Sequence, residues 1–129
     1  MVKDYVERVH RAKTADHLSP QIRMACEWII LEPQLHSIHS LAGKLKYTDY
    51  YFSKLFKRET GKSVNEYILL QKIETAKQFL VSTNMSVAEI TDQVGIESQS
   101  YFTARFRKAT GTTPKEYRNT HQSAKSDKR

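Results

Sequence analysis

Two stretches of the sequence carry polar and basic side chains at the spacing of one helix face. In the first, Tyr50, Ser53, Lys54 and Lys57 recur at intervals of three and four residues, which places them on one stripe of a helix. The second stretch offers a similar set: Gln99, Ser100, Thr103, Arg107 and Lys108. Gln bonds adenine bidentately, Ser and Thr donate or accept, and Arg and Lys bind guanine or phosphate. The whole set indicates contact with a nucleic acid, although any one residue alone is more simply a solvated helix surface.

Capping sequences mark where the helices that position these side chains begin. Ser19 precedes Pro20, which fits an N-cap followed by proline at the first helical position. Three further segments have Ser or Thr followed three residues later by Glu, the capping box in which both side chains satisfy backbone amides. These segments are 63–66, 86–89 and 113–116.

Apolar residues at spacings of three and four predict an all-α fold, and no alternating strand pattern of useful length is found. In the two polar stretches the core face is expected to hold Tyr51 and Tyr101 beside the phenylalanines, which leaves Tyr50 as the one aromatic side chain outside. Seven helices are expected, near 19–30, 41–45, 48–59, 63–83, 87–94, 98–109 and 113–118, with irregular ends at 1–18 and 119–129.

The chain contains an internal repeat. Residues 51–67 and 101–117 align at an offset of 50 with seven of 17 positions identical. The short helices before them align at an offset of 49, so the second copy has one extra residue in its turn. Each copy is a short helix, a tight turn and a second helix closed by Thr-Gly, which is the pattern of a helix-turn-helix unit.

The positive charge is concentrated on the second helix of each copy and on the C-terminal tail, where residues 113–129 carry a net +3. The formal net charge is +7 with a pI near 9.5. By sequence, residues 48–62 carry a net +2 and residues 98–112 a net +3, whereas the joining segment 63–97 carries −3. Two basic surfaces separated by an acidic joint suit one polyanionic partner.

Other function classes find little support in the sequence. No run approaches the roughly 20 apolar residues that span a bilayer, and a single cysteine, Cys26, fits a soluble protein of the reducing cytoplasm. Cys26 lies on an apolar stripe and is expected to be a buried small hydrophobe. His36 and His39 have no cysteine or carboxylate near them in sequence, so no metal site, cofactor or catalytic group is expected.

From about Ser19 to Arg118, the sequence resembles the DNA-binding domain of the AraC/XylS family of transcription regulators. The resemblance covers about three quarters of the chain, and its motifs form a long ordered array. The residues that carry it are the repeat, residues 72–77, residues 86–90, Gly95, Ile96, Tyr101, Phe102, Phe106, Gly111, Thr113, Pro114 and residues 116–118.

The resemblance implies a monomeric bacterial domain, typically of an activator, that places one helix of each unit in successive major grooves of double-stranded DNA. A joining helix of 21 residues would be about 31 Å long, close to one DNA turn of about 34 Å. Base-reading positions fall on Tyr50, Ser53, Lys54, Gln99, Ser100, Thr103 and Ala104. Phosphate positions fall on Lys57, Arg107, Lys108 and the helix starts at Ser63 and Thr113.

The expected organisation is a leading connector, two helix-turn-helix subdomains with a linker helix between them, and a disordered basic tail. Family members usually carry a separate effector-binding domain, so the chain is either a short stand-alone regulator or a piece of a longer one. No small-molecule pocket is identified. The expected boundaries are 1–18, 19–62, 63–83, 84–120 and 121–129.

Four residues depart from the family pattern. Lys46 stands where the first turn often has glycine; if that position needs positive φ, lysine costs about 1 kcal/mol. Ile96 is a mild core change. Ala104 replaces a frequent basic reader, and Arg105 matches Leu55 of the first copy, so it either extends from the core edge to solvent or reflects a rotated second unit. The first copy is therefore expected to dominate specificity.

The main alternative is a helical adaptor that contacts the transcription machinery, such as RNA polymerase, with little DNA affinity of its own. Such a module would show no DNA binding with a steep salt dependence. A single-strand RNA reader fits less well, because it needs exposed aromatic platforms and the sequence leaves only Tyr50 for that purpose.

Overall fold

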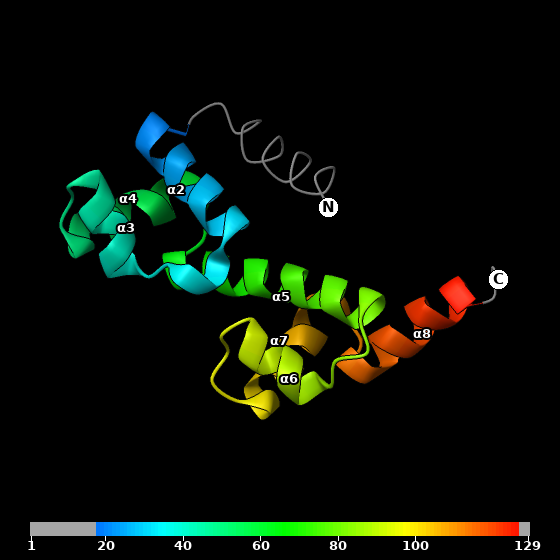
Figure 1. The fold of residues 1–129 in the computed structure, drawn as a ribbon. Helices are drawn as coiled ribbons and strands as arrows, with labels where there is room; N and C mark the ends of the chain where they lie inside the picture. The colour runs from blue at the N-terminus through cyan, green and yellow to red at the C-terminus, as the bar shows by residue number, and fades with distance from the viewer. Residues whose placement is uncertain (1–17, 127–129) are drawn as a thin grey trace. The chain divides into compact units, whose positions relative to one another are not determined.

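The structure, a computed structural model, describes residues 18–126, and the regular secondary structure of this part of the chain consists of helices joined by short turns and loops (Figure 1). The prediction of seven helices is confirmed here, with one additional 3₁₀ turn. None of these helices is long and apolar enough to cross a membrane. The elements are α2 (Pro20–Leu31), η1 (Pro33–Leu35), α3 (Ile38–Leu45), α4 (Asp49–Thr60), α5 (Val64–Ser82), α6 (Val87–Gln93), α7 (Gln99–Thr110) and α8 (Pro114–Ser126).

The chain divides into two compact units, one ending at Gln71 and one beginning at Lys72. The division falls inside α5, so this helix contributes its first part to one unit and its last part to the other. The expected leading connector lies, except for Leu18, outside the described residues.

The first unit is built on the apolar stripe of α2. Ser19 is the N-cap and its Oγ accepts from the Ile22 amide at 3.4 Å, with Pro20 at the first position. The backbone amide of Ser19 also donates to Glu59 at 2.7 Å, which ties the start of α2 to the end of α4. The core beneath contains Ile22, Ala25, Cys26, Ile29, Leu41, Ala42, Phe52, Leu55, Phe56, Val64 and Ile68.

The turn between α3 and α4 contains the one residue other than glycine with positive φ in the described chain. Lys46 has φ 62° and ψ 36°, so the condition that the sequence analysis left open, a positive φ at this position, is met. Its amide donates to the Gly43 carbonyl at 3.2 Å, and the Tyr47 amide donates to the Ala42 carbonyl at 2.9 Å. In the second unit Gly95 has φ 76°, at no steric cost.

The second unit repeats this arrangement around the end of α5. Ser86 and Glu89 form the predicted capping box at the start of α6. Ile96 is buried, as expected of a mild core change. The buried apolar side chains of this unit include Ile73, Ala76, Leu80, Ile90, Val94, Ile96, Phe102, Phe106 and Pro114.

The helix α8 is longer than the sequence predicted. It continues to Ser126, so the irregular end expected from residue 119 is wrong for 119–126. Arg118 donates to the carbonyls of Leu80 and Thr83 at 3.0 and 3.2 Å. Gln122 donates to the carbonyls of Leu80, Val81 and Thr83 at 3.1, 3.3 and 2.9 Å. These bonds satisfy the carbonyl end of α5 and hold α8 helical past residue 119.

Lys46→Gly is expected to raise the free energy of unfolding of the first unit by about 1 kcal/mol, because glycine removes the left-handed penalty. Lys44→Gly, inside α3, is the matched control and should lower it by about 1 kcal/mol. The single tryptophan, Trp28, packs against this core, so urea unfolding followed by its fluorescence measures both. A destabilised Lys46→Gly variant would contradict the strain argument.

Arg118→Met is expected to destabilise α8 by about 1–3 kcal/mol, because it leaves partly buried carbonyls of α5 without a cationic donor. Hydrogen exchange of the α8 amides measures the effect. Lys115→Met, an exposed position of the same helix, is the control. Equal exchange in the two variants would show that the Arg118 bonds do not hold the helix.

Candidate nucleic-acid interface

The helices α4 and α7, which carry the candidate readers, begin and end in the same way. Thr48 and Ser98 are the N-caps, and their side-chain oxygens accept from the Tyr51 and Tyr101 amides at 3.1 Å. Each helix ends at a glycine in the left-handed conformation, Gly61 with φ 82° and Gly111 with φ 88°. These local signals set both helices at 12 residues.

Buried phenylalanines set the rotation of each helix about its axis. Phe52 and Phe56 have ring centroids 5.7 Å apart, and Phe102 and Phe106 have centroids 5.6 Å apart. All four are fully buried. Because residues four apart share one helix face, burying them turns the opposite face to solvent.

The outer face of α4 presents the predicted set. Tyr50 is 72% exposed, Lys54 and Lys57 are exposed, and Ser53 is half-buried. Lys54 Nζ donates to the Tyr50 hydroxyl at 3.1 Å and lies 5.1 Å from the centre of the same ring. The structure therefore brings an aromatic ring and a cation together at the centre of this face.

The outer face of α7 carries the second set. Gln99 and Ser100 are exposed at its first turn, and Thr103 is half-buried. Arg107 and Lys108 are exposed in the last turn. The exposed Ala104 stands where α4 has Lys54, so this face lacks a central cation. Arg105 is half-buried at the position of the buried Leu55.

Two further tyrosines are exposed, against the prediction that they fill the core. Tyr51 and Tyr101 are each 50% exposed. The phenylalanines fill the buried face, and the tyrosines lie one residue before them, on the flank of the helix. The available signal was the phenolic hydroxyl, which favours a position that reaches water.

The two predicted phosphate-binding helix starts differ in the amides they offer. Ser63 Oγ accepts from the Glu66 amide at 3.1 Å. At α8 the Thr113 amide donates to the Glu116 carboxylate at 3.0 Å, and the Glu116 amide donates to Thr113 Oγ1 at 3.1 Å. Pro114 has no N–H, whereas α5 has Val64 in the same place. The start of α5 therefore offers a phosphate one backbone amide more than the start of α8.

The Glu116 carboxylate adds a negative charge at the start of α8. Hydrogen bonds from the backbone and side chain of Thr113 lower the pKa of Glu116. The carboxylate is thus ionised where a phosphate would otherwise sit against the positive end of the helix.

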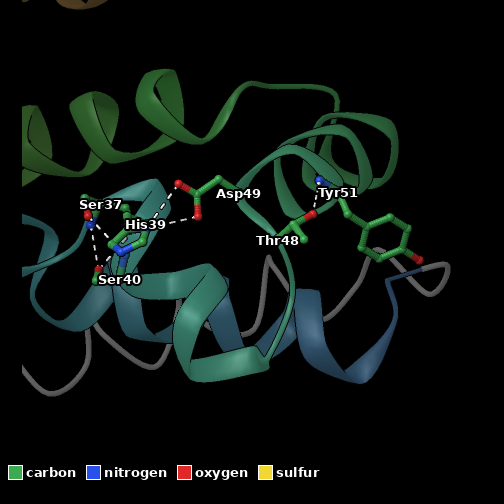
Figure 2. A network of polar contacts seen from close by, with 6 residues as sticks. All are labelled: Ser37, His39, Ser40, Thr48, Asp49 and Tyr51. Carbon is green, nitrogen blue, oxygen red and sulfur yellow. Dashed lines mark hydrogen bonds and ion pairs between the residues drawn. The ribbon is translucent and has the colours of Figure 1, made fainter.

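The start of α4 is held by contacts with α3 (Figure 2). Ser37 and Ser40 form a reciprocal cap at the start of α3. His39 Nδ1 lies 3.1 Å from Asp49 Oδ2, so the fold supplies the carboxylate that the sequence lacked near this histidine. Both side chains are exposed, which limits the pair to about 1 kcal/mol or less. The pair joins α3 to the turn of α4 that carries Tyr50.

The corresponding turn of the second unit is held by α5. Lys72 Nζ donates to the Gly95 carbonyl at 2.8 Å, and burial lowers the pKa of Lys72. This bond secures the turn that leads into α7. The sequence identified Lys72 only as part of the family pattern, because the contact spans 23 positions.

Within residues 18–126, no group of three or more His, Cys, Asp or Glu side chains is placed to hold a metal ion. Cys26 is buried, as predicted. Burial raises the pKa of the Cys26 thiol to about 11, although a hydrogen bond with Tyr67 opposes the shift. A thiol of this kind is protonated at neutral pH and is a poor nucleophile.

Comparison with known proteins places the chain among DNA-binding regulators. A family model described as a helix-turn-helix domain matches residues 41–120. The xylose operon regulatory protein of Escherichia coli K12 is 43% identical over 95 residues, which are 74% of this chain and 22% of that protein. The transcriptional regulator YobQ of Bacillus subtilis, described as uncharacterized, is 38% identical over 89 residues, 69% of this chain and 37% of its own length. The chain thus spans less than two fifths of either relative.

Solved structures show the same fold. The C-terminal domain of AraT, a response regulator from Geobacillus stearothermophilus, matches with a TM-score of 0.71 at 34% identity, covering 81% of this chain and 88% of that one. A xylose-binding transcription activator matches with a TM-score of 0.69 at 30% identity, covering 81% and 28%. The DNA-binding domain of AdpA in complex with a target DNA, at 20% identity and a TM-score of 0.72, covers 82% and 96% and shows likeness of fold alone.

Thr113→Ala is expected to raise the pKa of Glu116 toward its ordinary value, because the hydroxyl that helps to hold the ionised carboxylate is lost. Since the folded pKa is the lower one, the cap contributes stability above the ordinary pKa of 4.5, and this is lost as pH falls through the folded value. NMR titration of the Glu116 carboxyl measures the shift, with Thr120→Ala as the control. An unchanged midpoint in Thr113→Ala would contradict the assignment.

Proposed function

Since the chain belongs to the AraC/XylS family of helix-turn-helix DNA-binding domains, we propose that it regulates transcription by binding a specific sequence of double-stranded DNA. In this proposal α4 and α7 each enter a major groove, and the two grooves are successive ones on the same DNA. The observation that carries it is the repeated exposure of a polar and basic helix face opposite a buried pair of phenylalanines.

The two faces divide into base readers and phosphate binders. The base readers are Tyr50, Ser53 and Lys54 in α4, and Gln99, Ser100 and Thr103 in α7. The cations of the last turns, Lys57, Arg107 and Lys108, bind phosphates together with the amides near Ser63 and, more weakly, Thr113. Lys54 has the reach to take guanine, and the ring of Tyr50 orients it. The first unit supplies more of the specificity because α7 has Ala104 at the matching position.

The cellular location and the mode of regulation are proposed from the similar proteins. We place the protein in the bacterial cytoplasm, as a monomeric domain that acts on DNA without a cofactor. Activation is favoured over repression because one similar structure is that of a transcription activator.

A second candidate function is contact with a protein of the transcription machinery, such as RNA polymerase. The observation in its favour is that three apolar side chains of α2 and η1 are exposed: Met24, Leu31 and Leu35. Exposed apolar groups of this kind often mark protein contacts. The same domain can perform both functions, because these residues lie on helices other than α4.

Selection from a random double-stranded DNA pool, at two salt concentrations, tests the proposal directly. Two short enriched blocks about one helical turn apart are the expected result. Binding that depends on salt but enriches no motif would place specificity outside this chain. No binding at either salt concentration would overturn the proposal and favour the protein-contact function.

Lys54→Ala is expected to weaken binding to the selected site by about 1–3 kcal/mol and to relax base preference in one half-site. Lys57→Ala should weaken binding to every duplex alike and reduce the slope of log affinity against log salt by about one. Fluorescence anisotropy with the selected and a random duplex measures both. Identical behaviour of the two variants would contradict the division into readers and phosphate binders.

A further inference from the structure

The two tyrosines that are exposed, although the sequence predicted them in the core, occupy equivalent helix positions in the two units. Tyr51 and Tyr101 are each the third residue of their helix, and each amide is bonded to the N-cap side chain. Each is half exposed. The ring of Tyr51 packs edge-on against Tyr47, with centroids 5.0 Å apart and an interplanar angle of 69°, and it points away from the His39–Asp49 pair (Figure 2). Because this ring is already held by Tyr47, its hydroxyl can bind a ligand with little further loss of side-chain entropy.

A cation follows each tyrosine after seven residues. Arg58 follows Tyr51, and Lys108 follows Tyr101; both are exposed. Seven residues are two helical turns, so the tyrosine and the cation lie on the same side of their helix. That side adjoins the candidate readers, because Tyr51 comes directly after Tyr50. Each helix thus has a flank, defined by Tyr51 and Arg58 in α4 and by Tyr101 and Lys108 in α7.

The chemistry of these flanks fits phosphate rather than bases. A phenolic hydroxyl donates a hydrogen bond to a phosphate oxygen, and a cation two turns further along the same side of the helix supplies the opposite charge to the same strand; both are common backbone contacts in DNA complexes. When the readers of a helix face the floor of a groove, its flank faces the strand that borders the groove. A hydrophobic protein partner would not require a hydroxyl and a cation at the same two positions in both repeats.

We propose that Tyr51 with Arg58, and Tyr101 with Lys108, form two equivalent phosphate-binding flanks that fix how α4 and α7 sit in their grooves. The inference rests on the proposed function, since it requires DNA in contact with the outer faces of both helices. It adds Tyr51, Tyr101 and Arg58 to the contacts expected from the sequence, and it gives Lys108 a partner.

The test uses the full chain and variants that remove one group at a time. Tyr51→Phe and Tyr101→Phe remove only the hydroxyls, and Arg58→Gln and Lys108→Gln remove only the charges. Tyr117→Phe, whose ring packs on Phe106, and Lys44→Gln, whose ammonium lies over Trp28, are matched controls on other helices. Affinity for the selected duplex and for a random duplex is measured by fluorescence anisotropy across a salt series, with a thermal melt of each variant.

The two Tyr→Phe variants should each bind both duplexes roughly threefold to tenfold more weakly, the effect of one hydrogen bond. Their salt slopes should stay unchanged because no charge is lost. Arg58→Gln and Lys108→Gln should weaken both duplexes and lower the slope by about one. The controls should bind like the parent, and the melts of the tyrosine variants should match it.

Binding by both Tyr→Phe variants at the parent's affinity would overturn the inference while the proposed function stands. Losses confined to the selected duplex would also overturn it, because they would make the tyrosines base readers. Failure of the parent chain itself to bind either duplex at low salt would overturn the proposed function and this inference with it. The parent's own binding curve therefore distinguishes the two failures.

Discussion

The orientation of each second helix depends on the burial of its two phenylalanines. Phe52 and Phe56 in α4, and Phe102 and Phe106 in α7, are fully buried. Burying one such side chain contributes about 1.5–3 kcal/mol, more than an exposed ion pair of at most about 1 kcal/mol. The rings therefore decide how each helix is rotated. The polar faces that carry Lys54 and Arg107 are exposed as a consequence of this packing.

The same aromatic contact holds the second helix in both units, whereas the residue in the turn before that helix differs. Phe56 meets Tyr67 with centroids 5.5 Å apart at 75°, and Phe106 meets Tyr117 at 5.4 Å and 84°. Edge-on contacts of this kind lock each second helix to the next helix of its own unit. The first turn tolerates Lys46 in a left-handed conformation where the second has Gly95. The core is stable enough to hold a strained turn in place.

Most of the helices and much of the candidate interface were predictable because their signals are local. Thr48 and Ser98 as caps, and Gly61 and Gly111 as stops, act within four residues of where they stand. For Lys46 the family pattern raised the question of a positive φ, because its position often holds glycine, and the structure answered it. Exposure of Tyr50 and Lys54 followed from periodicity alone, because the phenylalanines already occupied the opposite face.

The sequence by itself determined the all-α class, the repeat, the helix starts and which face of each second helix is buried, because capping and helical periodicity are properties of neighbouring residues. Only the tertiary structure decided that Tyr51 and Tyr101 are exposed, that His39 meets Asp49, and that α8 runs to Ser126. The sequence shows which residues lie at the centre of an apolar stripe and are therefore buried. Whether a residue at the edge of the stripe is also buried depends on how far the neighbouring helix extends over it. Likewise, the bonds from Gln122 to carbonyls about 40 residues earlier form only once the chain has folded back. No local sequence pattern therefore predicts them.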